Sequence, residues 1–137
     1  MADMILDWGL FGTYGMQMTG TNVVNTGGID VTVDVAVEDE DADAFTRATP
    51  QYVAPGETFD PLSSLKLSGA GGEGGVDNTS TTTISFAATS PLYTDQVQNV
   101  SFRINDIDTG VSPETSVDIV TVRAYDAAGN ESPVVLS

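Results

Sequence analysis

The stretch Ile29-Asp30-Val31-Thr32-Val33-Asp34-Val35-Ala36-Val37 alternates strictly between large aliphatic side chains and polar or small ones. Successive side chains of a β-strand point to opposite faces, so five aliphatic side chains share one face of this stretch. An antiparallel sheet allows one face to be buried while the other is in water. The alternation therefore predicts a half-buried strand over residues 29–37 in an antiparallel sheet.

Strand signals recur along the rest of the chain. Residues 100–105 and 120–125 alternate in the same way, and residues 79–88 are rich in β-branched and aromatic side chains. Shorter candidate strands are residues 4–6, 14–18, 65–67 and 134–136. Turns that contain glycine or proline separate these segments, and a helical period is almost absent. The sequence therefore predicts an all-β fold, a single antiparallel, jelly-roll-like β-sandwich domain over residues 1–137.

Composition excludes several classes of function. The 137 residues include 20 acidic and 4 basic side chains, which give a net charge of −16, and there is no histidine and no cysteine. Disulfides, Ser-His-Asp or Cys-His catalysis and the usual zinc sites are thereby excluded. The negative charge argues against binding to nucleic acid or to anionic membranes. The remaining chemistry is that of oxygen ligands, which suit calcium, and we expect no enzymatic activity.

Four aspartates at predicted strand ends are the candidate calcium ligands. Asp106 and Asp108 follow the predicted strand at 100–105, and we expect them to share a face while Ile107 inserts into the core. Asp118 precedes the next predicted strand and could reach them if the two strands pair, and Asp126 lies in the turn over residues 125–131. The alternative is local turn chemistry, in which aspartate side chains accept hydrogen bonds from nearby backbone N–H groups.

Three further features are open to two interpretations. The acidic run at residues 38–43 could converge on a cation, but a solvated loop is favoured because no glycine wraps it around an ion. The glycine-rich stretch at residues 69–78 has no second copy to stack on, so we interpret it as a loop. An N-terminal group of large apolar residues is interpreted as part of the core, with a sugar-stacking platform as the alternative; its members are Trp8, Phe11, Tyr14, Met16 and Met18.

The C-terminal third of the chain resembles a known module. Residues 100–108 read VSFRINDID, and residues 118–131 read DIVTVRAYDAAGNE. This pattern is similar to that of the β-sandwich module of large secreted bacterial proteins that carry RTX calcium repeats or Hint domains. With the variable spacer between the two segments, the resemblance covers about 35 residues near the C-terminus. It implies a non-catalytic, extracellular, jelly-roll-like domain stabilised by calcium.

These observations predict a secreted or cell-surface module of the adhesin type, whose partners are neighbouring protein chains or glycans. The N-terminus lacks the pattern of a secretory signal peptide, and no stretch is long and apolar enough to insert into a membrane. The sequence ends within a predicted strand, so we expect the domain to be truncated or completed by a partner strand. The alternative function is a structural subunit of a filament, capsid or tail-like assembly, which would form a homo-oligomer. A glycosidase is a remote third hypothesis, since nothing places two carboxylates in a cleft.

Overall fold

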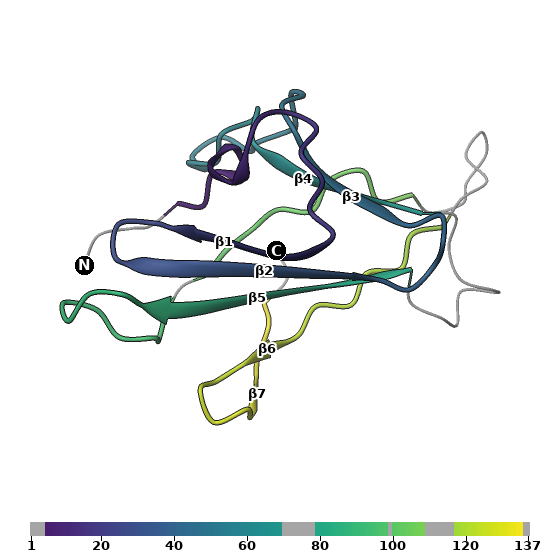
Figure 1. Cartoon of the computed structure of the whole chain (residues 1–137). Coiled ribbons are helices and arrows are strands. Elements are labelled where there is room, and N and C mark those ends of the chain that lie inside the picture. The colour runs from purple at the N-terminus through teal and green to yellow at the C-terminus, as the bar shows by residue number, and fades with distance from the viewer. Residues whose placement is uncertain (1–4, 70–78, 99, 109–116, 136–137) are drawn as a thin grey trace. The chain divides into compact units, whose positions relative to one another are not determined.

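A computed structural model describes residues 5–69, 79–98, 100–108 and 117–135 (Figure 1). In these ranges the chain forms antiparallel strands and one short 3-10 helix, η1 (Trp8–Phe11). The predicted all-β, antiparallel architecture is therefore confirmed. The chain divides into two compact units, Met1–Thr94 and Asp95–Ser137. The single domain and the jelly-roll strand order stay predictions.

The first unit contains a three-stranded antiparallel sheet. It consists of β1 (Gly20–Asn25), β2 (Ile29–Val37) and β5 (Ser80–Ala88), with β2 in the centre (Figure 1). The alternating stretch thus forms a strand with the bounds that its sequence predicts, and its first four aliphatic residues are buried. Val37 differs, because it is 40% exposed. The pairing of β1 with β2 reaches only as far as Val35, so Val37 lies beyond the end of β1.

A second sheet in the same unit pairs β3 (Asp43–Arg47) with β4 (Ser64–Ser68) in antiparallel fashion. The segment before β1 runs beside β3, because the Met18 N–H donates to the Ala44 carbonyl at 2.8 Å and the Thr46 N–H donates to the Met16 carbonyl at 3.0 Å. The prediction of a strand at residues 65–67 is confirmed. The candidate strand at residues 14–18 appears only as an isolated bridge between Gln17 and Phe45.

The core of the first unit is built from β2, β3 and the segment before β1. Its buried members are Met18, Val31, Val33, Val35 and Ala44, and the partly buried residues packed against them are Leu6, Trp8, Phe11, Leu65 and Phe86. Of the N-terminal apolar group, Trp8, Phe11 and Met18 therefore belong to the core. Tyr14 and Met16 are exposed, at 61% and 39%.

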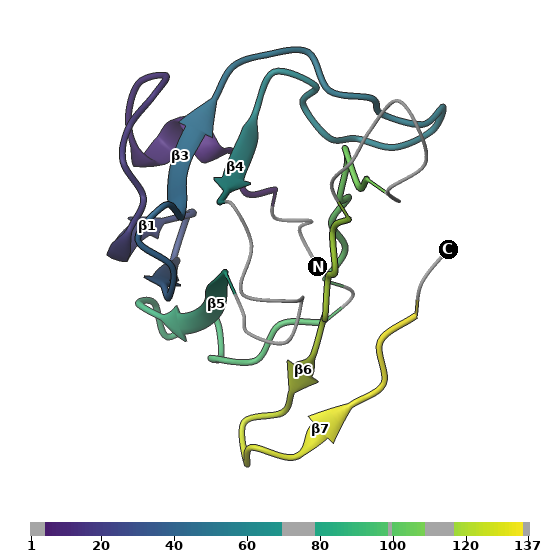
Figure 2. The same cartoon turned by 90° about the vertical axis from the view of Figure 1, so that its right-hand side faces the viewer.

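The second unit has little regular structure in its described part. Its strands are β6 (Ala124–Tyr125) and β7 (Glu131–Ser132), which form a small hairpin (Figure 2). Residues 100–108 and 118–123 lie outside any strand, so the strands predicted at 100–105 and 120–125 are confirmed only at residues 124–125. No described residue from 95 onward is buried. Among the described residues, 100–105 and 120–123 have the alternating sequence pattern of strands but form no ladder of backbone hydrogen bonds.

Candidate functional site

Asp108 and Asp118 are neighbours in the structure. The Asp118 N–H donates to the Asp108 carbonyl at 2.9 Å, and the Asp108 N–H donates to Oδ2 of Asp118, also at 2.9 Å. The sequence allowed Asp118 to reach Asp106 or Asp108 if the two predicted strands paired; Asp118 reaches Asp108, although neither segment forms a strand there. One oxygen of the Asp118 carboxylate therefore accepts a backbone N–H from a residue ten positions away in the chain.

Asp106 has a φ of 61°, in the left-handed region that residues other than glycine rarely adopt. Aspartate tolerates this region better than most residues do, because its short side chain can bond locally. The positive φ interrupts the extended backbone on which a shared face for Asp106 and Asp108 depends. Ile107 is 48% exposed, so the prediction that it inserts into a core is wrong. The physical reason is that none of the described residues around it is buried.

Asp126 closes the turn between β6 and β7. Its Oδ1 accepts hydrogen bonds from the N–H groups of Ala128 and Asn130, at 2.9 and 2.8 Å, and its Oδ2 accepts one from the Asn130 side chain at 3.0 Å. The Asn130 side chain and then its backbone N–H lower the pKa of Asp126, because these hydrogen bonds favour the charged form. Both carboxylate oxygens therefore already have donors without a cation.

Few carboxylate oxygens of the candidate calcium ligands lie close to one another. Within the described ranges, no group of three or more acidic side chains is placed to hold a metal ion. Asp108 and Asp118 bring two carboxylates together, whereas calcium takes 6–8 oxygen ligands. Calcium binding by Asp106, Asp108, Asp118 and Asp126 stays a prediction, and comparison of the melting temperature in calcium and in EDTA decides it.

The acidic run at residues 38–43 forms the tight connection between β2 and β3. The Ala42 N–H donates to the Asp39 carbonyl at 3.0 Å, and the Asp41 N–H donates to the Asp39 side chain at 3.3 Å. Asp43 accepts a hydrogen bond from the Ala44 N–H at 2.9 Å. These bonds are local turn chemistry. The glycine-rich stretch lies outside the described residues except for Gly69.

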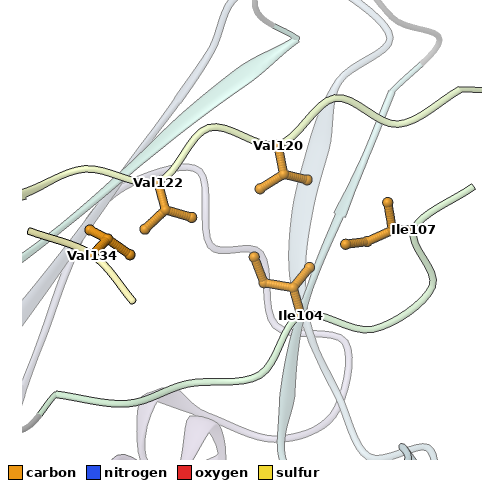
Figure 3. Close-up of a pocket in the computed structure, with 5 residues that line it drawn as sticks. All are labelled: Ile104, Ile107, Val120, Val122 and Val134. Atoms are coloured by element: carbon orange, nitrogen blue, oxygen red, sulfur yellow. The ribbon is translucent and has the colours of Figure 1, made fainter. Parts of the chain in front are cut away.

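An apolar hollow of about 330 Å³ lies in the second unit. It is lined by five aliphatic side chains from three segments of the chain, which Figure 3 shows turned toward a common space: Ile104, Ile107, Val120, Val122 and Val134. Three of them, Ile104, Val120 and Val122, belong to the alternating patterns at residues 100–105 and 120–125. This hollow was not predicted from the sequence, although the alternation that residues 100–105 and 120–125 share was the signal for it.

Comparison of the chain with protein-family models, curated proteins and solved structures finds no match. The resemblance to the module of secreted bacterial proteins therefore rests on the quoted residues and stays a prediction. Within the described ranges, no helix combines the length and the apolar character that a membrane span requires.

Proposed function

We propose that this chain is a non-catalytic extracellular or cell-surface β-module that binds a neighbouring protein chain through its second unit. The occupant is an extended segment of that neighbour, which adds a strand to residues 119–123. The observation that carries the proposal is the apolar hollow beside two strand-like segments that belong to no strand. The extracellular location rests on the resemblance of the sequence.

The backbone of the second unit is suited to strand addition. Residues 100–108 and 118–123 have the alternating pattern of strands but, in the described structure, form no strand ladder. Backbone N–H and C=O groups in such segments are a template for an additional strand. In peptide recognition of this kind, main-chain hydrogen bonds give affinity and pockets for alternate side chains give specificity.

The side chains of the second unit support an apolar contact. Phe102 and Ile104 are 57% and 41% exposed, and Ile119 and Val120 are 71% and 48% exposed. Contiguous exposed apolar residues mark interaction surfaces on soluble proteins. A neighbouring strand whose alternate side chains are valines would fill the hollow and remove these residues from water.

The test uses a labelled synthetic peptide of about nine residues, a common strand length, in which valine alternates with threonine. We expect saturable binding, measured by fluorescence anisotropy. Val122→Asp should weaken it at least tenfold, about 1.4 kcal/mol, because the substitution places a charge in the apolar contact.

Thr121→Asp is the matched control, because Thr121 is the exposed chain neighbour of Val122 and the substitution adds the same charge. Its binding should stay within about twofold of the unsubstituted chain. An absence of saturable binding, or an equal loss in both variants, would overturn the proposal. Displacement of the peptide by a soluble neutral polysaccharide would assign the surface to a glycan instead.

A further inference from the structure

Two of the four basic side chains of this acidic protein, Arg47 and Lys66, lie on the antiparallel pair of strands β3 and β4. The Arg47 guanidinium lies 5.6 Å from the centre of the Phe45 ring and 5.9 Å from that of Tyr14, and the Lys66 ammonium lies 5.8 Å from the Phe45 ring. Phe45 and Lys66 are directly paired across β3 and β4. We call Tyr14, Phe45, Arg47 and Lys66 the cationic hairpin face.

Among the residues that the structure describes, the cations of this face have no acidic partner. Although the chain has 20 acidic residues, neither Arg47 nor Lys66 forms an ion pair in the described structure. Their contacts are with aromatic rings, which contribute about 0.5–1 kcal/mol each at exposed sites. Aromatic contacts do not neutralise charge, so both cations can still bind a carboxylate.

A run of acidic residues lies at the end of β3 opposite to Arg47. The acidic turn, residues 38–43, leads directly into β3 at Asp43, whereas Arg47 ends that strand. Four residue steps of a strand, about 13 Å, separate Arg47 from Asp43, which is beyond the reach of an ion pair. Lys66, which is paired with Phe45, lies two residue steps nearer to that end. Hydrogen bonds from Glu38 to the Thr79 carbonyl and from Ala42 to the Asp39 carbonyl, both at 3.0 Å, hold the turn in place. Its Glu40 and Asp41 side chains are exposed.

From this separation of charge we infer that the cationic hairpin face binds the acidic turn of a second copy of the chain. The contact joins two different surfaces, so after one contact each copy still has its other surface unused and the arrangement is head-to-tail. Contacts of this type form rings where the rotation closes and open filaments where it does not. The inference goes beyond the proposed function, because it concerns the first unit and a like partner.

The charge of the whole chain gives this association a characteristic salt dependence. Two copies of net charge −16 repel each other, and at low ionic strength the repulsion acts over a long range. The Debye length is about 30 Å at 0.01 M, about 8 Å at 0.15 M and about 3 Å at 1 M. Intermediate salt therefore screens the overall repulsion while close ion pairs survive. Association should be strongest near 0.15 M and weaker on both sides, whereas an apolar contact strengthens steadily with a salting-out salt.

The experiment measures the mass of the full chain by light scattering at these three ionic strengths. The double substitution Arg47→Glu with Lys66→Glu places like charges on the two surfaces. The double substitution Glu40→Lys with Asp41→Lys does the same from the other side. Each variant alone should associate at least tenfold more weakly than the unsubstituted chain. An equimolar mixture of the two should regain association, because every contact between unlike variants is then complementary.

The mixture also controls for misfolding, since two damaged proteins do not restore each other. If the protein stays monomeric at about 1 mM in all three salts, the dissociation constant lies above the millimolar range and the inference is overturned. Association that rises steadily with salt, or a mixture that fails to regain it, would also overturn it. Neither variant should alter binding of the alternating peptide, so this inference and the proposed function fail separately.

Discussion

Replacing Val33 with aspartate is expected to unfold the first unit. Val33 has no exposed surface, and in the centre of β2 it is paired with Asn22 of β1 and Ile84 of β5. Its neighbours in the core are aliphatic and aromatic, so a carboxylate there would have no cation nearby. An uncompensated buried charge costs about 3–5 kcal/mol, against a total stability of about 5–15 kcal/mol for a native domain.

Ala36→Asp is the matched control for Val33→Asp. Ala36 lies in the same strand but is exposed, so the variant has the same net charge without the burial. We expect its urea midpoint to stay close to that of the unsubstituted chain, while Val33→Asp loses the cooperative transition followed by circular dichroism. Equal stability of the two variants would show that β2 does not bury the face assigned to it.

Met18→Ala is expected to cost about 2–5 kcal/mol, the usual range for removing a buried methionine side chain. Met18 is fully buried and lies in the core with Val31, Val33, Val35 and Ala44. Its backbone is fixed by the hydrogen bond to the Ala44 carbonyl, so the core has little freedom to close the cavity. The measurement is the free energy of unfolding from urea titration.

Met16→Ala provides the comparison, because Met16 is two residues away on the same segment and 39% exposed. Its loss should be well below that of Met18→Ala. A larger cost for Met16→Ala would mean that Met16, and not Met18, is the buried side chain of this segment.

The alternation at residues 29–37 was sufficient to predict β2, because a central strand with one buried face carries its own signal. The exposure of Val37 was not predictable in this way. It depends on where β1 ends, and the register of a distant strand is not present in the alternating stretch itself. The same limit applies to residues 100–105 and 120–125, where the pattern of a strand exists but strand formation needs backbone partners.

The candidate site was predictable in part. The sequence placed Asp118 within reach of Asp106 or Asp108 only if the two alternating segments paired as strands; the structure brings it to Asp108 without that pairing. For Asp126, the sequence favoured a plain hairpin turn over a metal ligand, and three hydrogen bonds within the turn agree with that interpretation. The positive φ of Asp106 had no sequence signal, since it reflects the path of the chain between two segments.

The central claim is that the second unit offers strand-like backbone to a neighbouring chain, and amide hydrogen exchange tests it most directly. We expect amides of β2 to exchange slowly, because both edges of this strand are paired. Amides at residues 119–123 should exchange at nearly the rate of an unfolded chain and slow at least tenfold when the alternating peptide is added. Slow exchange at these residues in the chain by itself, or no change on peptide binding, would contradict the account.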